Sequence, residues 1–395
     1  MKFWIGCLLF LVSNSYRGIS QSYSHLHKKA IVIDTHNDIL NACFEKHFSF
    51  DQDLKGKTHS DLKRFKQGGI DVQVFSIWCD GQKKDPYKYA NEQIDTLYAT
   101  IDRNQDKIIL VKSSDELLKA VQSKRIAAMI GVEGGHMIES DLSKLDNLFN
   151  RGARYLTLTW NNSTPWATSA MSETRDSLLP QSRGLNGFGK QLIKHMNELG
   201  MLVDLSHVGE QTFWDAIHIS SKPVLVSHSC VYKLCPAFRN LKDEQILAVG
   251  KNGGVIHLNF FSGFLDSSYA GKMATFEKRH LLEIDSVKKI HPDTRFINNY
   301  LDSKYKSELE AMRAPLVLVF DHLDYIIRLI GVDHVGLGSD FDGINSPPQQ
   351  LDDVTYYPLI TKGLLERGYS RKDVLKILGG NFIRLLKANE TISHF

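Results

Sequence analysis

The 395-residue chain lacks the features that mark several specialised protein classes. It holds only five cysteines and no CxxC pair, which argues against a disulfide framework and against a cysteine zinc knuckle. Its formal net charge is only +3, and it contains no long basic run and no nucleic-acid-binding motif, so we expect no nucleic-acid partner. Low-complexity tracts and short-period repeats are also absent. With 42% hydrophobic and 24% charged residues, the composition is that of a globular protein with a large core.

The N-terminus stands apart from this composition. A short basic start is followed by the apolar run Phe3–Val12 and then by small residues at a cleavage spacing. This pattern predicts a secretory signal peptide over residues 1–20, an exported protein (periplasmic or secreted), and one domain over residues 21–395. The alternative is an uncleaved anchor, but this run is too short to span a bilayer, and no other run is long enough. We therefore expect no stable membrane span after signal cleavage.

Four cysteines remain beyond this segment. An oxidising compartment permits disulfides without requiring them in a chain with a core of this size. Cys230 and Cys235 are candidates to pair with each other. The alternative is that the cysteines are small buried hydrophobic residues. The four are Cys43, Cys79, Cys230 and Cys235.

From residue 30 onward, short apolar runs rich in Val, Ile and Leu alternate with segments of helical period. Such runs are typical of strands buried on both faces, as in parallel sheets. Eight alternations favour an α/β fold of the (β/α)8 TIM-barrel type, as in metal-dependent hydrolases. A doubly wound open sheet is less well supported, because no Gly-rich dinucleotide fingerprint follows the first strand. The predicted strands are Ala30–Asp34, Val72–Trp78, Ala127–Glu133, Tyr155–Trp160, Leu202–Asp204, Val224–Ser227, Gly254–Asn259 and Val335–Gly338.

The intervening segments carry helix signals. Gly187–Leu199 has one apolar face and is followed by Gly200 as a stop, and Ser370 with Asp373 predicts another helix start. The stretch Phe264–Arg313, between the seventh and eighth strands, has no strand pattern and looks helical. We expect a helical insertion over residues 264–313 that serves as a lid or an oligomer contact.

Polar residues fall where five of the predicted strands end, which is where barrel enzymes place their active residues. Each residue alone is more simply read as a hydrogen-bonded loop residue. As a set they are aimed at one opening. The segments are Asp34-Thr35-His36-Asn37-Asp38, Glu133-Gly134-Gly135-His136, Asp204-Leu205-Ser206-His207, Ser227-His228-Ser229 and Gly338-Ser339-Asp340-Phe341-Asp342.

Imidazole and carboxylate donors without thiolates suit zinc or a similar divalent ion. His36 and Asp38 are two residues apart, so an extended backbone directs both to one ion. His207 and His228 follow neighbouring strands and are candidates for a second ion, with Glu133 bridging the pair. Two ions at roughly 3.5–4 Å suit hydrolysis by a metal-bridging hydroxide.

The remaining polar residues divide into catalytic and structural candidates. Asp340 is the candidate acid/base, which takes a proton from the attacking water and passes it to the leaving amine. Arg239 is a candidate clamp for a substrate carboxylate, with a surface salt bridge as an equal alternative. For Asp204 we expect a cap or a contact behind a ligand, and for His136 and Asp342 structural roles.

These motifs resemble the membrane dipeptidase (renal dipeptidase) family of zinc metallopeptidases. They keep their order from residue 30 to beyond residue 380. Together they are specific, although each alone is weak. The resembling segments are Asp34–Asp38, Gly131–His136, Tyr155–Thr159, Asp204–Val208, Val226–Ser229, Arg239-Asn240, Asp321–Asp324 and Gly338–Gly343.

The resemblance implies a barrel with two zinc ions that hydrolyses unblocked dipeptides, including those with a D-residue at the second position. It implies that Glu133 is shared between a zinc held with His36 and Asp38 and a zinc held with His207 and His228. It also implies that Asp340 is the acid/base, that Arg239 binds the substrate carboxylate, and that the protein is a homodimer.

The sequence departs from the mammalian-type members at several points. Trp160 stands where those members carry a His that polarises the scissile carbonyl, so Asn161 or another group must donate that hydrogen bond, or the substrate preference differs. Their cysteine pairs lack partners here, because Asn162 stands at one position and no Cys follows Cys235. Residues 264–313 are longer, and no hydrophobic C-terminal tail of the GPI type is present.

Two rival functions stay open on the sequence. One is a metal-dependent barrel hydrolase of lactones, cyclic amides or phosphoesters. Trp160 and the long insertion, as departures from the mammalian-type members, are consistent with this alternative. The other is an exported protein that binds a ligand or metal without catalysis. The presence of the whole ligand set together with Asp340 argues against the second.

Overall fold

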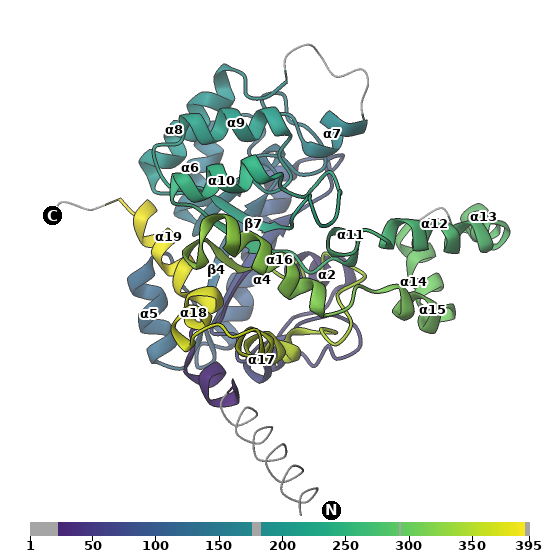
Figure 1. Cartoon of the computed structure of the whole chain (residues 1–395). Helices are drawn as coiled ribbons and strands as arrows, with labels where there is room; N and C mark the ends of the chain where they lie inside the picture. The colour runs from purple at the N-terminus through teal and green to yellow at the C-terminus, as the bar shows by residue number, and fades with distance from the viewer. Residues whose placement is uncertain (1–22, 176–182, 292–293, 392–395) are drawn as a thin grey trace, which may run out of the picture.

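The computed structural model describes residues 23–175, 183–291 and 294–391. The predicted signal peptide lies outside the described residues. Parallel strands form a nearly closed barrel, which confirms the predicted (β/α)8 fold (Figure 1). The barrel strands, in spatial order, are β1 (Ile33–Asn37), β2 (Val72–Trp78), β4 (Ile126–Glu133), β5 (Ala153–Thr157), β6 (Leu202–Asp204), β7 (Leu225–Ser229), β8 (Val255–Leu258) and β9 (Val335–Leu337).

The barrel closes between its first strand and the chain that follows its last strand. The Asp38 amide donates to the Phe341 carbonyl at 2.9 Å, and the Asp340 amide donates to the His36 carbonyl at 3.0 Å. Both bonds lie at the carboxyl ends of the strands. Closure therefore brings Asp38 and Asp340, which are far apart in sequence, to the same part of the rim.

Several strand bounds differ from the sequence prediction. β5, for example, runs over Ala153–Thr157 instead of Tyr155–Trp160, so Trp160 lies beyond the strand. β1 begins at Ile33 rather than at residue 30, because its ladder with β2 starts with the pair Ile33↔Val72 and runs to Asn37. His36 is therefore part of the strand itself. An additional strand, β3 (Ile108–Leu110), pairs only with the start of β4 and lies outside the barrel order. Its three residues are too few to show a strand period.

Helices surround the barrel, and two of them begin or end as the sequence predicts. α8 (Gly187–Leu199) ends at Gly200 in the left-handed conformation, with φ of 79°. α18 (Arg371–Leu375) begins with the Ser370 side chain accepting the Asp373 amide. The other helices around the barrel are α2 (Ile39–Lys46), α3 (Leu62–Gly68), α4 (Pro86–Arg103), α5 (Ser114–Gln122), α6 (Leu142–Asn150), α7 (Ala170–Arg175), α9 (Glu210–Ile219), α10 (Asp243–Asn252), α16 (Val317–Ile330), α17 (Pro358–Glu366) and α19 (Asn381–Asn389).

The core has two parts that together leave one end of the barrel for polar groups. Strand residues that face the helices form the larger cluster. Residues from the beginnings of the strands, such as Val72 and Ala127, form a second cluster with Phe382 and Leu386 of α19. This apolar plug fills the amino end of the barrel, so the carboxyl end is free to carry the site.

The insertion predicted over residues 264–313 is helical. It consists of α11 (Ser262–Leu265), α12 (Tyr269–Arg279), α13 (Leu281–Ile290), α14 (Thr294–Lys304) and α15 (Lys306–Met312). α12 to α15 stand off the barrel (Figure 1). They enclose a small core of their own around Tyr269, Phe276 and Met312. A role as lid or oligomer contact stays a prediction.

The four cysteines of the described residues are free and buried. The Cys230 thiol contacts the Asn259 carbonyl at 3.2 Å, and the Cys235 thiol contacts the Gly263 carbonyl at 3.4 Å. The Cys230–Cys235 pair is therefore not formed here, and the alternative of small buried residues applies. No helix in the described parts of the chain combines the length and the apolar character needed to cross a bilayer.

A carboxylate at the start of β2 makes stability depend on pH. Asp71 accepts the Val32 amide at 2.9 Å, and burial raises the pKa of its carboxyl to about 6. Because the pKa of Asp71 is higher in the folded protein than in the unfolded chain, its protonated form stabilises the fold. This stabilisation is complete below pH 4 and is lost as the pH rises through 6. Asp71→Asn should therefore raise the free energy of unfolding at pH 7.5 by about 1–2 kcal/mol and change it little at pH 4.

Denaturant unfolding of parent and variant at both pH values measures this difference. The exposed Asp53→Asn is the matched control and should shift neither curve. An Asp71→Asn effect of equal size at both pH values would contradict the assignment.

Candidate metal centre

Five side chains from four barrel strands meet at the carboxyl end of the barrel. His36 lies in β1, Asp38 follows that strand, Glu133 ends β4, His207 follows β6, and His228 lies in β7. All five are at least nine-tenths buried. We call His36, Asp38, Glu133, His207 and His228 the His–carboxylate cluster.

Glu133 is the centre of this cluster. Its Oε1 lies 2.8 Å from His207 Nε2 and 3.4 Å from His228 Nε2, while its Oε2 lies 3.3 Å from His36 Nε2. His36 Nε2 is also 3.6 Å from the carboxylate of Asp38. The structure therefore brings together every residue that the sequence predicted as a ligand.

The backbone is strained where it delivers the reactive groups. His207 and Asp340 have φ of 64° and 60°, in the left-handed region that non-glycine residues rarely adopt. At Gly343 an added Cβ would lie 2.1 Å from Asp38 Oδ2 and 2.6 Å from Asp340 Oδ1. Only glycine allows these two carboxylates and the following loop to come this close.

Charge interactions set the protonation states within the cluster. Burial would raise the pKa of Glu133, but the His36 charge and the neighbouring His207 and His228 imidazoles hold it well below its usual value. Burial and the Arg239 charge lower the pKa of His207 to about 4, and burial with the His36 charge lowers the pKa of His228 well below its usual value. An ionised carboxylate and neutral imidazoles are the states in which these groups bind metals.

His36 shows that the cluster attracts positive charge. Burial opposes its protonation, yet Tyr155 together with the Glu133 and Asp38 carboxylates raises the pKa of the imidazole well above its usual value. Asp340 adds a third acid, and burial together with Asp38 and Glu133 raises the pKa of its carboxyl. Three acids within a few ångströms of each other call for a compensating cation.

The donor set fits divalent ions. His36 Nε2 and Asp38 Oδ1 are buried and have no hydrogen-bond partner among the described residues. The described donors form two groups, and within each group the donor atoms lie within 4.8 Å of one another. One group is His36, Glu133 and His228, and the other is His36, Asp38 and Asp340. Nitrogen and oxygen donors without thiolate match zinc sites of the catalytic kind.

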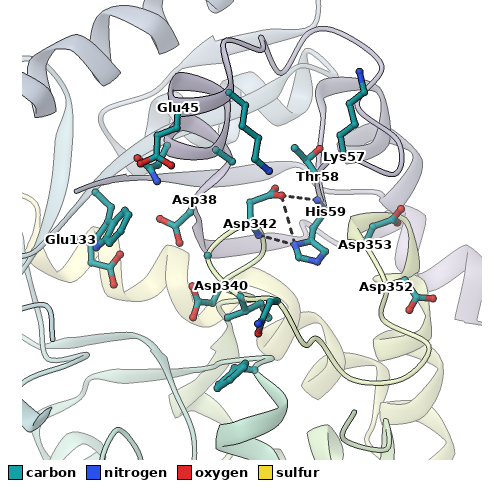
Figure 2. A pocket seen from close by; sticks show the side chains of 18 of the residues that line it. Asp38, Glu45, Lys57, Thr58, His59, Glu133, Asp340, Asp342, Asp352 and Asp353 are labelled. Carbon is teal, nitrogen blue, oxygen red and sulfur yellow. Dashed lines mark hydrogen bonds and ion pairs between the residues drawn. The ribbon is translucent and has the colours of Figure 1, made fainter. Parts of the chain in front are cut away.

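The cluster opens into a cavity of about 970 Å³. Asp38, Glu133 and Asp340 surround the same space, while Asp342 is turned away and bound to His59 (Figure 2). Asn259 Nδ2 donates to Asp340 Oδ2 at 2.8 Å. Oδ1 of Asp340 remains available toward the cavity.

Arg239 lies at the same cavity and is buried. Its Nη2 donates to the His228 carbonyl at 3.3 Å, its guanidinium lies over the Phe264 ring at 5.5 Å, and its Nε has no hydrogen-bond partner. A buried guanidinium with an unused donor is arranged to receive an anion. A surface salt bridge, the alternative from the sequence, does not describe this position.

Trp160 and Asn161 both line the cavity. The Trp160 ring packs edge-on against Trp78, with centroids 5.0 Å apart, and lies 6.3 Å from the His207 ring. Asn161 Oδ1 lies 3.1 Å from His207 Nδ1, so this oxygen is already paired with a member of the cluster. The aromatic ring of Trp160 thus stands at the position where the resemblance to the mammalian-type members implies a titratable imidazole.

The other strand-end residues have the structural contacts that the sequence suggested. Asp204 accepts hydrogen bonds from Thr157 and Ser227 and lies behind the cluster. His136 contacts the Cys79 carbonyl at 3.2 Å. Asp342 fixes its loop through the His59 amide at 2.6 Å.

Several residues that contact the site residues from within the barrel were not predicted from the sequence. Tyr155, Ser227 and Asn259 lie within predicted strands or at their ends, where they cannot be told from ordinary barrel residues. Trp78, at the end of β2, was also missed. Its position at a carboxyl strand end was the one available signal.

The chain is similar to known dipeptidases over most of its length. A model of the membrane dipeptidase family, peptidase family M19, matches residues 20–395. An uncharacterized dipeptidase of Schizosaccharomyces pombe is 32% identical over 94% of this chain and 84% of its own length. Dipeptidase 3 of Mus musculus is 30% identical over 91% of this chain, and the match spans 65% of that relative's length.

Solved structures share the fold. The probable dipeptidase PvdM from Pseudomonas aeruginosa superposes with a TM-score of 0.77 at 24% identity, over 94% of this chain and 98% of that one. A metallopeptidase from Rhodobacter sphaeroides, bound to a phosphinate mimic of the dipeptide L-Ala-D-Ala, gives 0.73 at 22% identity over 91% and 100%. The chain therefore belongs to the membrane dipeptidase family, peptidase family M19, and is a metallopeptidase of the dipeptidase class.

Proposed function

We propose that the chain is a dinuclear zinc dipeptidase that hydrolyses unblocked dipeptides. The observation that carries this proposal is the meeting of three imidazole Nε2 atoms on the two oxygens of Glu133, beside Asp38. A single carboxylate with ligand histidines on both of its oxygens has the arrangement of a bridge between two ions.

In this proposal the ligands divide between the two oxygens of Glu133. His36, Asp38 and Glu133 would hold one zinc, and His207, His228 and Glu133 would hold the other. When bound, such a pair supplies water that is acidic near neutral pH and polarises the attacked carbonyl. The chain's own residues then position the substrate and move the proton.

Asp340 is the proposed acid/base. Asn259 holds its Oδ2, so Oδ1 faces the cavity and is the atom that exchanges protons. Oδ1 takes a proton from the attacking water and gives it to the nitrogen of the leaving amine, which breaks the C–N bond. The raised pKa of Asp340 suits both the acceptance and the return of a proton near neutral pH.

Arg239 is the proposed anchor for the substrate's C-terminal carboxylate. Its unpaired Nε and the remaining Nη donors offer a two-pronged site. The phosphinate mimic of L-Ala-D-Ala bound to the Rhodobacter sphaeroides relative supports a D-residue at the second position. Trp160, Trp78 and Asn161 border this substrate space, where the aromatic pair excludes water.

The direct test combines metal analysis with a substrate screen. Purified protein should contain about two zinc ions per chain, and chelation should abolish dipeptide hydrolysis until zinc is restored. The screen compares dipeptides with an L- or D-residue at the second position against lactones and phosphotriesters. Hydrolysis of a lactone or phosphotriester without dipeptide cleavage would overturn the proposal in favour of that alternative.

Asp340→Asn should keep both zinc ions and lower kcat by about 10²–10⁴-fold, because the amide cannot exchange the proton. Asp352→Asn changes an acid on the rim of the same cavity that pairs with Arg313, and serves as the matched control with activity near that of the parent. A fully active Asp340→Asn variant with normal metal content would refute the role of Asp340.

Arg239→Ala should lower kcat/KM for dipeptides with a free carboxylate by about 10–100-fold, which is the worth of a charged hydrogen bond. Hydrolysis of the corresponding amides should change little, so the selectivity between the two falls. Arg239→Lys, which keeps the charge without the fork, should lie between. Unaltered selectivity in Arg239→Ala, at parental zinc content, would rule out the anchor.

The setting of this activity is part of the proposal. We place it in one exported domain over residues 21–395 that acts as a homodimer, with the arm of residues 264–313 as lid or subunit contact. The family resemblance and the apolar N-terminal run support this view. N-terminal sequencing of the secreted protein and its mass in solution measure the two properties.

A further inference from the structure

Each histidine of the His–carboxylate cluster is held at its second ring nitrogen. The three Nε2 atoms face Glu133, and the three Nδ1 atoms each contact a different side chain. The pairs are His36 with the Tyr155 hydroxyl at 2.8 Å, His228 with Ser227 Oγ at 2.8 Å, and His207 with Asn161 Oδ1 at 3.1 Å.

The Tyr155 hydroxyl does not need to donate its proton to His36. It donates to the Thr35 carbonyl at 3.3 Å, so its oxygen is free to accept from His36 Nδ1–H. Tyr155 is buried inside the barrel. Its ring fits there because Gly131 faces it, where an added Cβ would lie 1.9 Å from Tyr155 Cζ.

Ser227 is arranged in the same way. Its hydroxyl donates to Asp204 Oδ2 at 2.6 Å, which leaves its oxygen to accept from His228 Nδ1–H. Asp204 is itself held by the amides of Ser206 and Ser227 and by the Thr157 hydroxyl. Asp204 and Ser227 therefore form a fixed chain of acceptors that ends on His228.

Asn161 completes the set at the rim. Its side-chain oxygen accepts from His207 Nδ1–H, and its backbone carbonyl accepts the Ser169 hydroxyl at 2.7 Å, which fixes the loop. All three imidazoles thus find an acceptor at Nδ1. A neutral imidazole protonated at Nδ1 keeps its lone pair at Nε2, which is the atom that faces Glu133.

We infer that Tyr155, Ser227 with Asp204, and Asn161 are positioning residues that fix all three imidazoles as Nδ1–H donors, so that each Nε2 is a ready metal ligand. This inference rests on the proposed dinuclear centre. Partners of this kind commonly change metal affinity by about 10–100-fold when they are removed. The roles differ by ion, because Tyr155 acts on His36 and the other groups act on His207 and His228.

The test is zinc binding by metal-stripped protein in competition with a chromophoric chelator. Tyr155→Phe, Ser227→Ala and Asn161→Leu should each weaken zinc binding at one of the two sites by about 10–100-fold. They should also alter the visible spectrum of the Co²⁺-substituted protein. Tyr98→Phe, which removes a hydroxyl bonded to Arg151 outside the barrel interior, is the matched control and should leave both readouts unchanged.

Circular dichroism and thermal unfolding establish that each variant is folded. Asn161 lies at the cavity rim, so Asn161→Leu remains informative if a barrel-interior variant fails to fold. Asn161→Asp restores the acceptor and should recover zinc affinity relative to Asn161→Leu. Parental zinc affinity and Co²⁺ spectra in the folded variants would overturn the inference.

Metal binding requires no turnover, so this experiment is separable from the activity assay. A parent protein that binds two ions and cleaves no dipeptide would refute the proposed function while the comparison of variants still decides the present inference. A parent protein that binds two ions and cleaves dipeptides, with variants of equal affinity, would refute the inference alone.

Discussion

The contact of the Glu133 carboxylate with three imidazoles is the interaction on which the site depends. It joins β1, β4, β7 and the loop after β6 at one point. A carboxylate and three histidines buried together are costly unless each has a partner and the net charge is compensated. The cluster is therefore a destabilised region supported by the barrel around it, and a cation is the partner that its charge requires.

The rest of the structure can be understood as the support for this cluster. The apolar plug with Phe382 and Leu386 fills the amino end of the barrel and leaves the polar groups to the other end. Tyr155 and Asp204 reach the cluster from within the barrel, while strained backbone at His207 and Asp340 turns those side chains inward. Such strain persists only where surrounding packing over-determines the conformation.

The cavity above the cluster is lined by both charged and aromatic side chains. Arg239 and Asp340 both line this cavity beside the His–carboxylate cluster. Trp160, packed on Trp78, gives the cavity an aromatic surface. The helical arm after β8, formed by α12 to α15, stands off the barrel (Figure 1).

The sequence by itself determined the barrel and the set of candidate ligands, because buried parallel strands leave continuous apolar runs and their carboxyl ends leave polar residues at fixed places. His36, Asp38, Glu133, His207 and His228 were identifiable on that ground. The tertiary structure alone decided which groups hold them. Tyr155 and Ser227 look like ordinary strand residues, β3 is too short to carry a period, and the pairing of Asn259 with Asp340 joins positions 81 residues apart. Such contacts depend on barrel closure and strand register, which are collective properties of the packed chain and leave no mark on local sequence.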